Sequence, residues 1–290
     1  MKNKKMIKWI LVPALIHALI FIFLPIIGSL IISFMDYNPL RAGNNFVFLE
    51  NYKDLFKDPL FFQSLKNTLI FVFVTVTLNI VFSLGIAYMI SLFRSNKVKS
   101  FFRVIFFLPC VAPLVATSVV FSNAYFSKYG LFNSFLSLIG KDSILWLGDP
   151  KFVMPSMILF TLWVDIGYNI ILFSAGIDGI PQYVYEAAEI DGANEWYKFS
   201  RITLPLLGRT FFFVTLNTLI SHFQMFAQFS VMLLKDGPQY SGLVLSRYIY
   251  KVGFELKNLG YASAISMIFF LIILTVSVIQ QRRNKIEWEY

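Results

Sequence analysis

The stretch from Asn67 to Leu92 reads NTLIFVFVTVTLNIVFSLGIAYMISL and contains no Lys, Arg, Asp or Glu. A helix that crosses the ~30 Å hydrocarbon layer of a bilayer needs about 20 mostly apolar residues, so this stretch is long enough to span a membrane. Strands of a membrane β-barrel would instead alternate apolar and lumen-facing residues in short segments. Because that alternation is missing, the stretch predicts a transmembrane helix.

Five further apolar stretches of similar length are present. The sequence therefore predicts an all-α integral membrane protein with six transmembrane helices, at about Trp9–Phe34, Asn67–Leu92, Val104–Phe126, Phe152–Ile177, Thr210–Leu234 and Leu259–Gln280. Charged residues make up 14% of the chain, against roughly 25% in soluble domains. The first stretch exceeds the core of a signal peptide and is expected to be retained. With no internal repeat or linker, residues 1–290 are expected to form one transmembrane domain.

Lys and Arg concentrate in the short segments beside alternate spans. One cluster precedes the first span, one fills the short connection after the second, and one follows the last; they are Lys2, Lys4, Lys5 and Lys8, then Arg94, Lys97, Lys99 and Arg103, then Arg282, Arg283 and Lys285. Short cytoplasmic segments carry an excess of Lys and Arg, so both termini are predicted to be cytoplasmic. The net charge of +9 thus reflects membrane topology better than nucleic-acid binding.

The cytoplasmic connection 178–209 is unusually long and reads DGIPQYVYEAAEIDGANEWYKFSRITLPLLGR. Pro181 suits the first turn of a helix, which is expected over Gln182–Ile190. Gly192 is suited to a left-handed C-terminal stop, and Asn194 can cap a second short helix.

In that second helix Trp196, Phe199 and Ile202 are predicted to share an apolar face, with Lys198 and Arg201 pointing elsewhere. From physical chemistry alone the segment is either a docking element or a solvated connector.

Several motifs carry a family resemblance. Glu186-Ala187-Ala188, Asp191-Gly192-Ala193 and Ile202-Thr203-Leu204-Pro205 resemble, in residues and spacing, the EAA loop of binding-protein-dependent ABC importer permeases. Shorter stretches resemble other parts of carbohydrate-uptake permeases of the maltose F-like, multiple-sugar or raffinose type: Leu49-Glu50-Asn51-Tyr52 with Asn67-Thr68, Phe107-Leu108-Pro109 with Pro113, Tyr129-Gly130-Leu131-Phe132-Asn133, Asp236-Gly237-Pro238 and Gly260-Tyr261-Ala262-Ser263-Ala264. Asp236-Gly237-Pro238 departs from the family's usual Gly-Gly-Pro because Asp236 replaces the first glycine.

The resemblance implies a type I ABC importer permease fold in a bacterial plasma membrane and a non-catalytic subunit of a sugar importer. Its partners would be a second permease, two ATP-binding cassette subunits and an extracytoplasmic sugar-binding protein. The contact to the ATPase would be carried by Glu186, Ala187, Ala188, Asp191 and Gly192. The sequence contains no G-x-x-x-x-G-K-[ST] phosphate loop, so ATP and Mg²⁺ would be bound by the partner ATPase, and the chain itself needs no cofactor or metal.

Polar residues inside spans are candidates for the substrate path. In the fourth span Asp165, Tyr168 and Asn169 share a helical face. The fifth span contributes Asn217, Ser221, His222 and Gln224, and Trp163 and Trp146 are candidates to stack on a sugar ring. Amides, a carboxylate and aromatic rings suit a sugar. The alternative role for these residues is hydrogen bonding between helices, and Cys110 is expected to be buried packing.

A second class of function is an ion- or proton-coupled secondary sugar carrier, suggested by Asp165 and His222. Such carriers often contain inverted repeats and broken helices, and neither is evident in this sequence. An intramembrane enzyme would need a paired nucleophile or a metal cluster, and His17 and His222 have no such spacing with acids or cysteine. His17 is expected to be a packing residue. The importer permease is therefore favoured, with a neutral oligosaccharide as substrate.

Overall fold

A computed structural model of the protein describes residues 11–41, 44–127 and 129–283. Nearly all regular structure in these ranges is helical, and the strands found there are β1 (Met35–Asp36) and β2 (Asn45–Phe46), which pair antiparallel. The backbone forms two compact units. One contains the described residues up to Phe62 and Arg247–Leu274, and the other contains Gln63–Ser246 and the described residues from Thr275. The all-helical class is confirmed, and the single domain stays a prediction.

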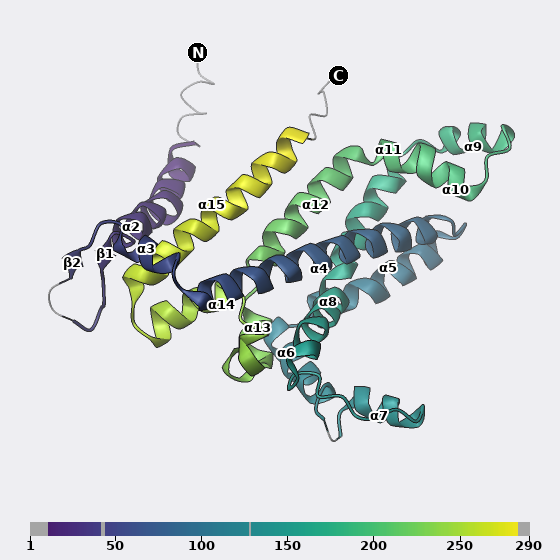
Figure 1. Ribbon diagram of the computed structural model, residues 1–290. Coiled ribbons are helices and arrows are strands. Elements are labelled where there is room, and N and C mark those ends of the chain that lie inside the picture. The colour runs from purple at the N-terminus through teal and green to yellow at the C-terminus, as the bar shows by residue number, and fades with distance from the viewer. Residues whose placement is uncertain (1–10, 42–43, 128, 284–290) are drawn as a thin grey trace, which may run out of the picture. The chain divides into compact units, whose positions relative to one another are not determined.

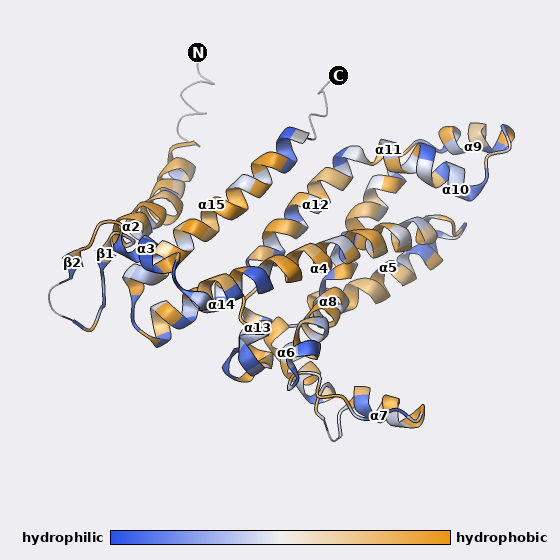
Figure 2. Cartoon of the chain, in the orientation of Figure 1, coloured by the Kyte–Doolittle hydropathy of each residue, from blue (hydrophilic) through white to orange (hydrophobic). Residues whose placement is uncertain are grey.

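Four single helices in the described residues are long and apolar enough to cross a membrane. They are Leu11–Ile32, α4 (Pro59–Ser91), α8 (Pro150–Asp178) and α15 (Leu259–Arg283). The first contains a π-helical turn at Leu19–Phe23 followed by α2 (Leu24–Ile32), and Trp9 and Ile10 of its predicted range lie outside the described residues. Figure 2 shows hydrophobic residues along most of α2, α4 and α15. These helices match four of the six predicted spans.

The predicted third span, 104–126, is two helices rather than one. α5 (Asn96–Val111) and α6 (Leu114–Ala124) meet at 92°. Ala112 between them is extended, with ψ 141°, and Pro113 caps α6. A proline disfavours the helical conformation of the residue before it, which explains the break at this position.

The predicted fifth span, 210–234, is also interrupted. α12 (Gly208–Phe223) ends before Gln224, and α13 (Ala227–Met232) begins after Phe226. The hydroxyl of Ser246 donates to the Met225 carbonyl at 2.6 Å, which satisfies a backbone group that the break frees. The expectation from sequence that broken helices are absent is therefore wrong. No local signal in the sequence indicates this break, because no proline or glycine lies at it.

The segment before α12 is bent from it as well. The helical stretch Glu195–Leu206 and the stretch Gly208–Met232 meet at 73°. The described residues therefore contain four to six spans, and six is reached if each bent pair crosses the membrane once. The count of six and the cytoplasmic placement of both termini stay predictions.

In the unit that contains β1, several polar and close backbone contacts hold the loops around the start of α15. The Asn51 amide of α3 (Glu50–Leu55) donates to the carbonyls of Ser33 and Met35 at 2.9 and 3.0 Å. Gly260 lies so close to β1 that an added Cβ would be 2.0 Å from the Met35 carbonyl oxygen. The Asp58 carboxylate accepts hydrogen bonds from the hydroxyls of Tyr248 and Tyr261. These contacts join segments that are distant in sequence.

In the other unit α8 is the central helix. Its side chains Met157, Phe160, Ile170 and Phe173 are fully buried. α8 approaches α5 most closely at Gly167, where an added Cβ would be 1.9 Å from the Phe106 carbonyl oxygen. The two helices can therefore meet only because this position has no side chain.

Gly167→Ala should force α5 and α8 apart. Overpacking of a buried contact costs typically 1–3 kcal/mol, so we expect a loss of about 3 kcal/mol in the free energy of unfolding. Thermal unfolding of the purified chain in detergent measures it. Gly85→Ala in α4 is the matched control, because no atom lies within 4 Å of its added Cβ. Equal midpoints for the two variants would contradict the close packing.

Candidate functional site

A polar cavity of about 360 Å³ lies in the second unit, between α8, α12 and the end of α5. Its walls contain six of the seven residues predicted for the substrate path. The lining is Cys110, Asp165, Tyr168, Asn169, Asn217, Thr218, Ser221, His222 and Met225. The seventh predicted residue, Gln224, does not line it; it is the C-cap of α12, so the helical spacing on which its prediction rested ends there. The fold thus gathers residues of two predicted spans around one space.

The carboxylate of Asp165 faces the imidazole of His222 across part of this space. The distance from Asp165 Oδ2 to His222 Nε2 is 3.9 Å, which is longer than a hydrogen bond. His222 Nδ1 lies 2.8 Å from the Thr218 carbonyl oxygen. Since a carbonyl only accepts, Nδ1 carries the proton in the neutral ring, and Nε2 is left facing the carboxylate. The His222 side chain is 1% exposed and that of Asp165 is 34% exposed, so Asp165 is the more accessible of the two lining residues.

A second polar group lies one turn further along α8. The Asn169 amide nitrogen donates to Asn79 Oδ1 at 2.7 Å and to Thr218 Oγ1 at 2.8 Å. All three side chains are buried, and they come from α8, α4 and α12. Asn169 therefore both lines the cavity and holds three helices together, which combines the two roles that the sequence left open.

Sequence reasoning missed Asn79 as well as the lining residues Cys110, Thr218 and Met225. Asn79 belongs to a row with Thr75 and Ser83, four residues apart on α4, and all three are fully buried. Residues at i and i+4 share a helix face, so this row was a detectable signal.

Cys110 was expected to be buried packing, but it is only partly buried and lines the cavity. Its thiol donates to the Val164 carbonyl at 2.8 Å. Neither tryptophan lies in the lining. Trp146 Nε1 donates to Asn133 Oδ1 at 3.0 Å, and Trp163 packs on Phe121 with ring centres 4.8 Å apart.

The expected loop of two short helices is confirmed. α9 spans Gln182–Ile190, and Pro181 is its N-cap rather than its first helical residue. Gly192 has φ +77°, the left-handed conformation that glycine adopts without strain. Asn194 Oδ1 accepts from the backbone N–H of Tyr197 at 2.8 Å and caps α10 (Glu195–Tyr197). Figure 1 shows α9 and α10 side by side beyond the end of α12.

The predicted coupling residues present mostly exposed surface. Glu186, Ala187, Asp191 and Gly192 are exposed, whereas Ala188 is buried. A groove of about 540 Å³ lies along the loop and includes Ala187, Ala188, Asp191 and Gly192 in its lining. The Glu186 carboxylate accepts from the Gln182 amide at 2.8 Å, a contact within α9 that leaves the rest of the acid in solvent.

The predicted apolar face of the second helix is wrong in part. Trp196 is 73% exposed, whereas Lys198 is 7% exposed. The segment Lys198–Thr203 is π-helical, which changes the angular positions that an α-helical pattern assumes. Lys198 consequently lies on the inner side of the loop.

Two hydroxyls tie α9 to this segment. Thr203 Oγ1 donates to the Lys198 carbonyl at 3.2 Å and lies 2.9 Å from the Tyr185 hydroxyl, so Tyr185 donates to Thr203. Burial raises the pKa of Tyr185, so the phenol keeps its proton at neutral pH.

Comparison with known proteins agrees with this arrangement. Residues 79–285 match the family described as binding-protein-dependent transport system inner membrane component. The chain is 33% identical over 283 residues to the probable ABC transporter permease protein YurN of Bacillus subtilis, covering 97% of this chain and 96% of that one. It is 34% identical over 277 residues to the lactose transport system permease protein LacF of Rhizobium radiobacter, covering 94% and 92%. The arabinooligosaccharides transport system permease protein AraP of Bacillus subtilis is 32% identical, covering 92% and 84%.

Solved structures agree on the fold. A chain of a bacterial ABC transporter involved in the import of the acidic polysaccharide alginate matches with a TM-score of 0.87 at 24% identity, covering 99% of this chain and 98% of that one. A chain of the bacterial alginate ABC transporter in complex with alginate pentasaccharide-bound periplasmic protein matches with a TM-score of 0.88 at 23% identity, covering 98% of this chain and 95% of that one. The fold is that of an ABC importer permease.

The protein belongs to the family of inner membrane components of binding-protein-dependent transport systems. This agrees with the expected permease and with the expected lack of catalysis in the chain, since the family consists of membrane subunits. A family that depends on binding proteins also disfavours the ion- or proton-coupled carrier, although helices broken as in such carriers do occur here.

Asn169→Ala should destabilise the bundle. It removes the donor shared by two buried acceptors, Asn79 Oδ1 and Thr218 Oγ1, and an unsatisfied buried polar group costs about 1–3 kcal/mol. We expect a loss of about 2 kcal/mol in the free energy of unfolding, measured by thermal unfolding in detergent. Asn217→Ala is the control, because Asn217 is an exposed residue of the same cavity. If both variants unfold at the wild-type midpoint, the network does not hold the helices.

Proposed function

We propose that the protein is the transmembrane subunit of an ATP-driven carbohydrate importer. It forms the translocation path with a second, homologous permease, and two ATP-binding cassette subunits that hold ATP and Mg²⁺ drive the cycle. An extracytoplasmic binding protein delivers the sugar. The observation that carries this proposal is the polar cavity between α8 and α12 in a chain of a binding-protein-dependent transport family.

The chemistry of the lining supports a neutral sugar. Hydroxyl groups of a sugar both donate and accept hydrogen bonds, and the lining offers amides at Asn169 and Asn217, a hydroxyl at Ser221 and a carboxylate at Asp165. It contains no Lys or Arg, so an anionic substrate would meet the Asp165 charge without a cation. Named relatives transport lactose, arabinooligosaccharides and diacetylchitobiose. We infer a neutral di- or oligosaccharide, of the raffinose or multiple-sugar kind.

The loop Gln182–Thr203 is proposed as the contact to the ATPase. Its exposed acids and the turn at Gly192 form one surface, and the sequence matches the EAA pattern at those positions. Glu186, Ala187 and Asp191 would face the ATPase, Gly192 would set the turn, and Ala188 would allow α9 to pack closely on the segment behind it. Under this proposal both termini lie in the cytoplasm of a bacterial cell, and the chain lies in the plasma membrane.

Asp165→Asn should impair uptake while leaving assembly intact. The amide keeps the shape of the carboxylate but loses a charge-assisted hydrogen bond to a sugar hydroxyl, so we expect the KM for uptake to rise roughly tenfold, or about 1.4 kcal/mol. Proteoliposomes with the whole importer and radiolabelled lactose, raffinose or arabinotriose measure it. Ser137→Ala in α7 (Leu131–Leu138) is the control, because that hydroxyl donates within its own helix. Unchanged uptake in Asp165→Asn would remove Asp165 from the path.

Gly192→Pro should release the ATPase. Proline fixes φ near −65°, whereas Gly192 has φ +77° with open space around an added Cβ, so the effect is conformational. Asn tolerates the left-handed region, and Gly192→Asn should keep the complex. The measurement is purification of the tagged chain from native membranes, with the associated proteins identified by mass spectrometry. If wild type brings down neither a phosphate-loop ATPase nor a second permease, the importer proposal fails.

A further inference from the structure

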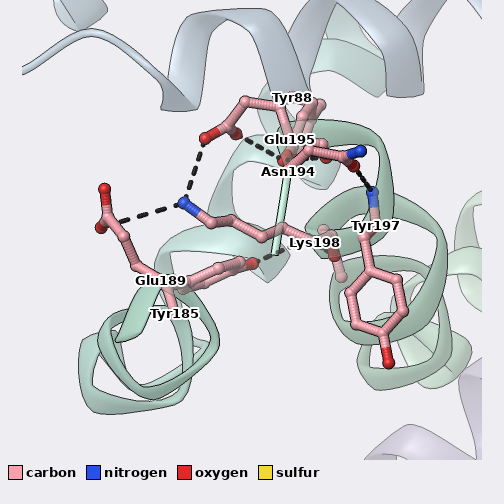
Figure 3. A network of polar contacts seen from close by, with 8 residues as sticks. Tyr88, Tyr185, Glu189, Asn194, Glu195, Tyr197 and Lys198 are labelled. Carbon is pink, nitrogen blue, oxygen red and sulfur yellow. Dashed lines mark hydrogen bonds and ion pairs between the residues drawn. The ribbon is translucent and has the colours of Figure 1, made fainter. Parts of the chain in front are cut away.

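Lys198 is a buried lysine inside the coupling loop. Its side chain is 9% exposed, although lysine is among the residues least often buried unless it is paired. Its ammonium lies 3.1 Å from Glu195 Oε1 and 3.8 Å from Glu189 Oε2. Figure 3 shows it between the two acids, one on α9 and the other on α10. A single cation therefore joins the two helices of the loop.

The same network reaches a transmembrane helix. The Tyr88 hydroxyl, near the end of α4, lies 3.0 Å from the Glu195 carbonyl oxygen and 3.1 Å from its Oε2 (Figure 3). The rings of Tyr88 and Phe199 lie 4.9 Å apart. Glu195 thus contacts Lys198 through one carboxylate oxygen and Tyr88 through the other. The loop is tied to α4 by a polar link as well as by packing.

α4 extends from this link to the cavity. Asn79 precedes Tyr88 by nine residues, or roughly 13 Å along a helix that rises 1.5 Å per residue, and Asn79 accepts from Asn169 in the cavity wall. No helix break separates the two positions, because α4 is one helix from Pro59 to Ser91. A tilt of the loop against α4 would therefore move a helix that supports the cavity.

The geometry indicates orientation rather than stability as the role of Lys198. Glu189 is 75% exposed and Glu195 is 55% exposed, and ion pairs with such exposed partners contribute little to stability. The buried stem of the lysine can be replaced by an apolar side chain of similar length. The charge, in contrast, is the part of the side chain that contacts an acid on each of α9 and α10.

We infer that Lys198 is a positioning residue that, through Glu195 and Tyr88, links movement of α9 to α4 and hence to the cavity. This inference rests on the proposed function, since it assigns a route between the ATPase contact and the sugar path. Two sites are coupled only if a change at one shifts the other, and spatial continuity alone does not establish it. The test must therefore measure coupling.

The experiment uses the complete importer in proteoliposomes, with its ATPase and sugar-loaded binding protein. The readout is sugar molecules imported per ATP hydrolysed, with the ATPase content of each preparation measured in parallel. Lys198→Met should assemble and hydrolyse ATP but lower this ratio by about fivefold, the lower end of typical allosteric coupling. Lys198→Arg keeps the charge and should restore at least half of the ratio. Lys97→Met, at an exposed lysine in the first turn of α5, is the control.

Tyr88→Phe removes only the hydroxyl and provides a second, independent test. It should lower the ratio by about threefold, and the double variant with Lys198→Met should be no worse than Lys198→Met alone, because residues in one network are not additive. A wild-type ratio in either Lys198→Met or Tyr88→Phe overturns the inference, as does a failure of Lys198→Arg to restore any coupling. If Lys198→Met does not assemble, the import ratio of Tyr88→Phe alone tests the inference. A wild-type preparation without ATPase overturns the proposed function, and this inference with it.

Discussion

Inside a bilayer no water is available to satisfy polar groups, so each one must find a partner within the protein, and the rest of this structure depends on that constraint. It explains why Asn169 donates to both Asn79 and Thr218 and why His222 contacts the Thr218 carbonyl. It also explains why the Ser246 hydroxyl contacts the carbonyl freed where α12 ends. Side chains that line the cavity are thus held in place by buried polar groups of neighbouring helices.

The cavity and the loop arrange their polar side chains in opposite ways. In the cavity, polar side chains of α8 and α12 line a shared space between apolar helices. In the loop, the acids face outward, and the buried cation Lys198 holds the two short helices together from within. α4 contacts both regions, through Asn79 in the cavity wall and Tyr88 near the end of the helix. One unbroken helix therefore connects the cavity wall to the loop.

Much of the fold and part of the site could be predicted from the sequence. The long apolar runs predicted α4, α8 and α15, and capping residues predicted α9 to its last residue, because these signals are local. The breaks in the third and fifth predicted spans were not anticipated. The first has a local cause in Pro113, but the second has no proline or glycine and depends on contacts with Ser246. Gln224 was predicted for the path because helical spacing was extended past the end of α12 at Phe223. The two tryptophans were predicted for their aromatic rings, but they contact Asn133 and Phe121 instead.

The sequence by itself determined that the chain lies in a membrane, that its helices are apolar, and that residues 186–205 form an EAA-type loop, because composition, capping and motif spacing are properties of neighbouring residues. The tertiary structure decided which polar residues meet. It brought Asn79 of α4 against Asn169 of α8, allowed α5 onto α8 at Gly167, and turned Lys198 inward through a π-helical segment. Those outcomes depend on contacts between residues far apart in the chain, and no local pattern carries that information.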